Sequence, residues 1–131
     1  MIEVLVDSYF WLGAINSRDP YHNQILQTAK PPRGVTTDAI LLEAMDALSS
    51  PRVREAAVQF WKQVHTDPDL LIIPLDEQLL NDALMIYEQH KDKSWSLTDC
   101  ISFVVMKKRE ISEALTADHH FEQAGFQIRF K

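Results

Sequence analysis

Two aspartates of this chain each follow a short apolar stretch that is typical of a β-strand. Asp7 comes directly after residues 4–6, and Asp118 comes directly after residues 114–117. In open α/β sheets, ligands bind outside the carboxyl ends of the strands, so two such carboxylates share one crevice if their strands are neighbours. Carboxylates are ligands of hard divalent cations. The alternative for Asp7 is a helix cap, because a helical pattern begins at Ser8.

Glu43 is a third acid that needs an explanation. It stands among apolar neighbours in the helical segment 39–47, with Ala39 and Ala47 one turn to either side. A charged group on a largely buried helix face is unfavourable unless it is paired or binds a metal. The alternative is a side chain that reaches solvent past the two alanines. We expect Glu43 to lie on a buried face and to join the same site.

Hydroxyl side chains accompany both strand-end acids. Ser8 follows Asp7, and Thr116 lies two residues before Asp118. Because alternate residues of a strand point to the same face, Thr116 places its hydroxyl beside the acid. These hydroxyls are candidates for supporting roles at the site.

Three further polar residues near these acids have ordinary structural explanations. Asp99 fits a helix capping box together with Ser96. His119 and His120 follow the second strand-end acid, but consecutive residues point in different directions. The sequence therefore does not favour the two histidines as metal ligands.

Strand and helix patterns alternate along the chain and position these residues. Strands are predicted at residues 4–6, 35–36, 70–75, 114–117 and 126–130, and helices begin near residues 8, 20, 37, 51, 76, 97 and 118. The alternation and the short connections predict a three-layer α/β/α sandwich with a mainly parallel sheet of about five strands. Residues 30–34 are predicted to be a connection, because they combine prolines and a glycine.

Two apolar patterns carry more specific expectations. The uninterrupted apolar run 70–75 predicts a strand that is covered on both faces. The next helix is predicted to present a single apolar stripe, formed by Leu79, Leu80, Ala83, Leu84 and Tyr87.

Length, charge and cysteine content limit the class of protein. The 131 residues suit one domain spanning 1–131. The net charge of −6 argues against a broad basic surface for nucleic acid, although cations bound at an acidic site would neutralise part of it. The single Cys100 excludes an internal disulfide and is expected to be buried. No membrane segment or secretory signal is predicted, and we expect the chain in the cytoplasm.

The four acids lie in motifs that resemble those of PIN-domain ribonucleases, most closely the VapC-type toxins of bacterial toxin–antitoxin pairs. The motifs are VLVD at 4–7, TT at 36–37 followed by LE at 42–43, SLTD at 96–99, and LTAD at 115–118 with Phe121 and Gly125. They cover essentially the whole chain in the family's order. The resemblance implies a PIN-like fold.

This resemblance also implies a chemistry. It makes Asp7, Glu43, Asp99 and Asp118 the catalytic, metal-binding carboxylates for Mg²⁺ or Mn²⁺, and makes Ser8 and Thr116 supporting residues. It implies metal-dependent hydrolysis of RNA phosphodiester bonds, a homodimer, and an antitoxin protein as partner. Where some members have a further acid one turn after the third, this chain has Phe103, which leaves the number of metal ions open.

Three other interpretations remain open at this level. The fold could serve as an interaction module without nuclease activity, or as a nuclease that has no antitoxin. A phosphotransfer fold of the receiver type also places an aspartate after its first strand. That class requires a second acid near Asp7 and a lysine after a later strand, and the sequence shows neither.

Overall fold

Five parallel strands form one sheet at the centre of the molecule, in the order β3-β2-β1-β4-β5. The structure is a computed structural model that describes residues 2–28 and 33–131. The strands are β1 (Val4–Val6), β2 (Gly34–Thr37), β3 (Leu70–Ile73), β4 (Glu113–Leu115) and β5 (Gln127–Ile128). The chain leaves β1 toward β2 on one side and later returns to β4 on the other. The strand order therefore reverses between β1 and β4, which is the condition under which the acids that follow these two strands share one crevice.

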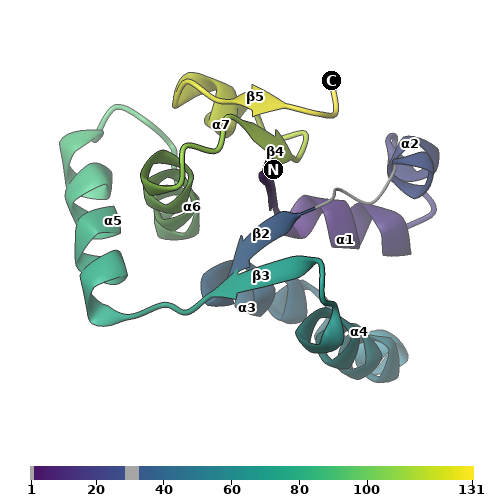
Figure 1. Cartoon of the computed structure of the whole chain (residues 1–131). Coiled ribbons are helices and arrows are strands. Elements are labelled where there is room, and N and C mark those ends of the chain that lie inside the picture. Colours follow the sequence, from purple (N-terminus) through teal and green to yellow (C-terminus); the bar gives the residue numbers. More distant parts are fainter. Residues whose placement is uncertain (1, 29–32) are drawn as a thin grey trace.

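Helices cover both faces of this sheet. They are α1 (Ser8–Ile15), α2 (His22–Gln27), α3 (Asp38–Ala47), the 3₁₀ turn η1 (Pro51–Val53), α4 (Arg54–Thr66), α5 (Glu77–Gln89), α6 (Leu97–Lys108) and α7 (His119–Gln123). Helices α5 and α6 lie on one side of the sheet, whereas α1, α2 and α4 lie on the other (Figure 1). The predicted three-layer α/β/α fold is confirmed. None of the described helices has the length and apolar character needed to cross a membrane.

Strand β1 is buried on both of its faces, because alternate side chains point to opposite layers. Leu5 packs with residues of α5 and α6, whereas Val4 and Val6 pack with Ile25 of α2. Cys100 of α6 is fully buried, as predicted. The apolar sequence of β1 thus belongs to the central strand of the sheet.

Strand β3 differs from its prediction. The apolar run 70–75 was expected to be covered on both faces, but β3 ends at Ile73, stands at the edge of the sheet and is only partly buried. Pro74 follows directly and has no N–H to donate to a ladder. An apolar run indicates a strand, but it does not reveal how many neighbours that strand has.

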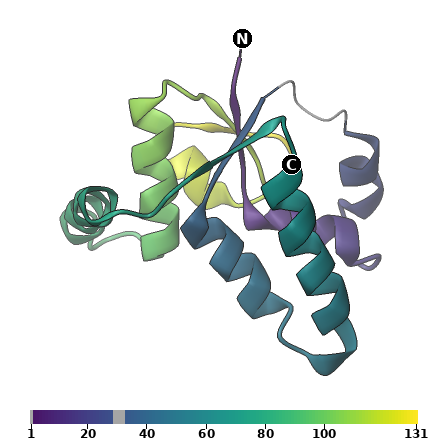
Figure 2. The ribbon, with the colours of Figure 1, turned by 60° about the horizontal axis from the view of Figure 1, so that its bottom comes forward.

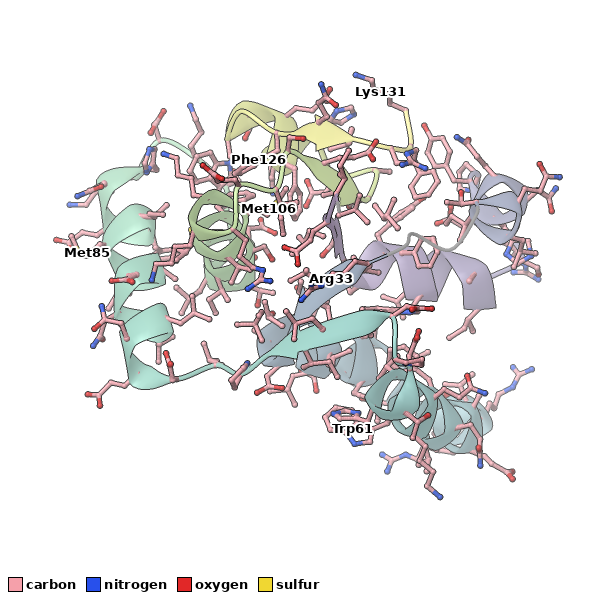
Figure 3. The ribbon with its side chains drawn as sticks, in the orientation of Figure 1. Arg33, Trp61, Met85, Met106, Phe126 and Lys131 are labelled. Atoms are coloured by element: carbon pink, nitrogen blue, oxygen red, sulfur yellow. The ribbon has the colours of Figure 1, made fainter. Side chains whose placement is uncertain are left out.

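Helix α5 also differs, because only part of its predicted apolar stripe is buried. Leu79 and Ala83 are buried in the layer that α5 shares with α6. The other members of the stripe are exposed: Leu80, Leu84 and Tyr87. Figure 3 shows Met85 on the outer side of α5, pointing away from the sheet. Because α5 packs mainly on α6 and lies away from the strands, its contact is narrower than the sequence pattern suggests.

Several element boundaries differ by one or more residues. Strand β4 ends at Leu115 rather than at Ala117, and β5 is shorter than the predicted 126–130. Of the predicted connection 30–34, residues 30–32 lie outside the described residues, and Gly34 already belongs to β2. The shorter β4 places Thr116 just beyond the strand.

Candidate metal centre

A cleft of about 780 Å³ has all four predicted acids in its wall: Asp7, Glu43, Asp99 and Asp118. The strands are parallel, so their carboxyl ends share one edge of the sheet. Figure 2 shows the amino terminus at the opposite end of the strands from the starts of α1 and α3. The acids come from four separate segments: the end of β1, the middle of α3, the first turn of α6 and the residue before α7.

The side chain of Asp7 does not cap α1. Asp7 occupies the N-cap position, yet its carboxylate makes no capping hydrogen bond. Instead, Thr116 Oγ1 donates a hydrogen bond to Asp7 Oδ2 at 2.8 Å. The pairing of Val6 with Leu115 places these next residues side by side. The capping alternative for Asp7 is therefore wrong.

Thr116 joins the two strand-end acids. Besides donating to Asp7, its Oγ1 accepts a hydrogen bond from the backbone N–H of Asp118 at 3.1 Å. The Thr116 side chain is fully buried, so one hydroxyl holds the ends of β1 and β4 in a fixed relation. Thr116 was predicted to support the site beside Asp118. Its hydroxyl contacts the Asp118 backbone, and the carboxylate that it orients is that of Asp7.

Asp7 has an unusual proton affinity. Burial leaves the residue 8% exposed and raises the pKa of its carboxyl to about 7. The negative charges of Glu43 and Asp99 raise this pKa as well, whereas the hydrogen bond from Thr116 lowers it. The Asp7 carboxyl thus binds a proton near neutral pH when no cation is present to replace that proton.

Glu43 lies in the cleft but is not buried, which corrects the prediction. Ser8 Oγ donates a hydrogen bond to Glu43 Oε1 at 2.6 Å. Glu43 is exposed, whereas the buried face of α3 is formed by Ala39, Ile40, Leu41 and Ala44. Apolar neighbours in the sequence misled the prediction, because a short helix at the edge of the core turns only one stripe inward. Ser8 nevertheless directs this carboxylate toward the strand-end acids.

Asp99 combines its structural role with a place in the cleft. Its backbone N–H donates to Ser96 Oγ at 3.0 Å, and its Oδ2 accepts from the Ser96 N–H at 3.1 Å, which confirms the capping box. His120 Nδ1 also lies 2.9 Å from the same Oδ2. Because both contacts use Oδ2, a capping role and a metal-binding role can use different oxygens of one carboxylate.

His120 is the site residue that the sequence did not favour. Its Nδ1 lies 2.9 Å from Asp99 and 3.4 Å from Asp118 Oδ1, whereas His119 is exposed and pairs with Glu122. Asp118 caps α7 by accepting the His120 N–H at 2.9 Å, which turns the start of the helix back toward the cap. The sequence did contain a sign of this contact, because His120 lies two residues after Asp118. An aspartate cap that accepts the N–H of residue i+2 brings that residue close to its own carboxylate.

The donor set fits a divalent cation. Asp99, Asp118 and His120 each offer one ligand atom, and these three atoms lie within 4.8 Å of one another. Asp7 and Glu43 add further carboxylates to the same cleft. A set rich in carboxylate oxygens, with one imidazole and no thiolate, favours Mg²⁺ or Mn²⁺.

The cleft is strongly anionic. Asp19 joins the four acids in its wall, and no lysine or arginine is among the described residues that line it. The cationic end of α6 is engaged elsewhere, since Lys108 pairs with Asp82 at 2.7 Å and Arg109 pairs with Glu3 at 2.8 Å. Glu3 precedes β1, so Arg109 lies at the amino edge of the sheet, away from the cleft.

We expect the substitution Thr116→Val to destabilise the metal-free protein at about pH 8. The change removes the donor to Asp7 and leaves the Asp118 N–H without its partner, so the free energy of unfolding falls by about 1–3 kcal/mol. Urea unfolding measures this loss. The matched control is Thr66→Val, because Thr66 is exposed at the end of α4 and its hydroxyl bonds only to backbone carbonyls of its own helix. Equal losses in both variants would contradict the role given to Thr116.

Comparisons with known proteins show which proteins this chain is similar to. A family model described as "PIN domain" matches residues 4–127. Curated relatives include the 23S rRNA-specific endonuclease VapC20 of Mycobacterium tuberculosis, which is 28% identical over 125 residues, covering 94% of this chain and 95% of the relative.

Solved structures show the same fold. The crystal structure of M. tuberculosis VapC20, described as a Sarcin-Ricin loop cleaving toxin, matches with a TM-score of 0.84 and 27% identity over 94% of this chain and 95% of that one. A toxin–antitoxin complex from Klebsiella pneumoniae matches with a TM-score of 0.65 and 13% identity over 96% and 95% of the two chains. VapBC2 from Rickettsia felis matches with a TM-score of 0.67 and 16% identity over 99% and 98%.

Proposed function

This chain belongs to the PIN domain family, and from that premise we propose that it is a metal-dependent endoribonuclease. The observation that carries the proposal is the convergence of Asp7, Glu43, Asp99 and Asp118 in one cleft at the point where the strand order reverses. RNA is preferred to DNA as substrate because the VapC20 relative is described as a 23S rRNA-specific endonuclease. The reaction is hydrolysis of a phosphodiester bond.

We assign Asp7, Glu43, Asp99 and Asp118 as the residues that would hold Mg²⁺ or Mn²⁺, and His120 would add a further ligand beside Asp99 and Asp118. When bound, the cation supplies a water of lowered pKa and stabilises negative charge on the phosphate. Without a cation, the acidic cleft repels the phosphates of the substrate.

Two hydroxyl residues act by positioning carboxylates. Thr116 orients the Asp7 carboxylate, and Ser8 orients the Glu43 carboxylate in the same cleft. Both hydroxyls donate to carboxylates, so neither is available to the substrate as a donor in this arrangement. Their contribution is to fix ligand orientation before a cation arrives.

The biological role that we propose is the toxin of a VapBC-type pair. The support is the similarity to VapC20, which is described as a toxin, and the shared fold with chains that were solved in toxin–antitoxin complexes. An antitoxin partner, a homodimer, a single domain over 1–131 and a cytoplasmic location belong to this proposal. Co-expression with the protein encoded immediately upstream tests the pairing: a stable complex that suppresses cleavage is expected, and full activity beside a non-binding neighbour would favour a stand-alone nuclease.

The activity itself is tested with purified protein freed of metal by a chelator. A hairpin RNA that carries the sarcin–ricin sequence is the first substrate, because that loop is the described target of the relative. We expect cleavage after Mg²⁺ or Mn²⁺ is added, none with excess EDTA, and none of the DNA hairpin of the same sequence. If both cations leave RNA intact and also fail to raise the melting temperature, the chain is an interaction module instead.

A further inference from the structure

A second pocket adjoins the acidic cleft at the connection between α5 and α6. Its volume is about 390 Å³, and Ser94 lines both this pocket and the acidic cleft. Its wall is rich in basic and aromatic side chains: Tyr87, His90, Lys91, Lys93 and Trp95. We propose that this basic pocket binds a nucleotide of the RNA strand beside the phosphodiester that is cut, an inference that rests on the proposed function.

The charge distribution creates the need for such a pocket. The acidic cleft holds five carboxylates and, among the described residues of its wall, no lysine or arginine. Cations at the carboxylates compensate the phosphate that reacts, but the neighbouring phosphates of the same strand still face an anionic surface. Favourable contacts with those phosphates must therefore come from side chains just outside the cleft. The basic pocket is placed for this, because the two cavities share the wall at Ser94.

The two lysines of the basic pocket are available to a phosphate. Lys91 is exposed and makes no ion pair with a described residue. Lys93 Nζ pairs with the adjacent Asp92 at 2.8 Å, and the Asp92 side chain is 72% exposed. An exposed pair of this kind contributes little stability. A phosphate oxygen can thus replace the Asp92 carboxylate without disturbing the fold.

The wall of the basic pocket is already organised. Trp95 is buried, and its Nε1 donates to Gln123 Oε1 at 2.9 Å. The ring of His90 lies 4.8 Å from the Trp95 ring, and His90 Nδ1 lies 2.9 Å from the carbonyl oxygen of Ile86. The side chains of Trp95 and His90 therefore need little further ordering on binding. Tyr87 is 49% exposed and offers an aromatic surface on which a base can stack without regard to its identity.

The inference predicts a specific loss of RNA affinity. In an Asp7→Asn background, which keeps the substrate intact, the double variant Lys91→Glu/Lys93→Glu is expected to bind a labelled single-stranded RNA of about 12 nucleotides at least tenfold more weakly. Replacing two phosphate contacts should also reduce the slope of log affinity against log salt concentration by about 1.4. Fluorescence anisotropy over a series of salt concentrations in the presence of Mg²⁺ measures both quantities.

The matched control carries the same change of charge at two other exposed lysines, Lys62→Glu/Lys107→Glu, which line neither cavity. This control is expected to change affinity by less than about threefold and to keep most of the salt slope. An equal loss of RNA affinity in the two double variants would overturn the proposed nucleotide binding at the basic pocket, but it would not contradict the proposed nuclease activity. Wild-type cleavage is measured in parallel, and its absence would overturn the proposed function whatever the binding shows. The neutral pair Lys91→Gln/Lys93→Gln should fall between wild type and charge reversal.

Discussion

The substitution Asp7→Asn is expected to abolish metal-dependent RNA cleavage and, at the same time, to stabilise the metal-free protein at about pH 8. Asparagine has the shape of aspartate and can still accept the Thr116 hydrogen bond, but it carries no charge. The buried Asp7 carboxyl has its pKa raised to about 7, mainly by burial, so ionising it at higher pH opposes folding. Removing that charge therefore relieves a cost of up to about 4 kcal/mol.

The sign of this effect depends on pH. A carboxyl whose pKa is higher in the folded than in the unfolded state stabilises the fold most at low pH, and this stability is lost as the pH rises from about 4 through about 7. Asparagine does not titrate, so the advantage of Asp7→Asn over wild type should grow with pH over this range. Thermal melts of chelator-treated proteins at about pH 4 and pH 8 measure it.

The matched control is Asp46→Asn, which removes an exposed acid of α3 outside the acidic cleft. It is expected to retain cleavage and to melt like wild type at both pH values. An Asp7→Asn variant that still cleaved RNA in a metal-dependent manner would refute the role of Asp7. If Asp7→Asn melted at a lower temperature than wild type at high pH, the raised pKa of the buried Asp7 carboxyl would be refuted.

The affinity for Mg²⁺ or Mn²⁺ is expected to fall by about tenfold for each pH unit below about 7. The cation and the proton compete for the Asp7 carboxylate, since a ligand must be deprotonated to bind a metal. Calorimetric titrations at several pH values give the affinity. Titrations in buffers of different ionisation enthalpy give the number of protons released, which should approach one per cation below pH 7 and vanish well above it.

His120 is a second residue that contacts the carboxylates of this site, since its ring lies against Asp99 and Asp118. The variant His120→Gln separates the two. If Asp7 controls the competition, the variant loses some affinity at every pH but keeps the tenfold dependence. A flat pH dependence in wild type, or one that disappeared in His120→Gln, would contradict the assignment of the competing proton to Asp7.

Local sequence predicted the features that depend on local structure. The capping box of Ser96 and Asp99 lies within one helical turn, so the residue types alone specify its hydrogen bonds. The placement of Asp7 and Asp118 in one cleft was also predictable once β1 and β4 are neighbours, because acids that follow neighbouring parallel strands lie at the same edge of the sheet. The sequence left open whether these two strands are neighbours, and the sheet order supplies that condition.

Tertiary packing decided the features that local sequence left open. The apolar residues around Glu43 and along α5 are consistent with burial, but the number of neighbours that each helix finds determines which face is covered. The same holds for β3, whose apolar run belongs to an edge strand. Periodicity describes one element, whereas burial depends on the elements that pack against it.

The sequence by itself therefore determined the parallel α/β fold and the four acids that line the cleft. Only the tertiary structure decided how these acids are held. In the folded chain, the Asp7 carboxylate accepts a hydrogen bond from Thr116 and does not cap α1, the exposed Glu43 accepts one from Ser8, and His120 contacts Asp99. The partners in these three contacts are 109, 35 and 21 residues apart in the chain. Contacts over such separations follow from how strands and helices are assembled, because no local spacing specifies them.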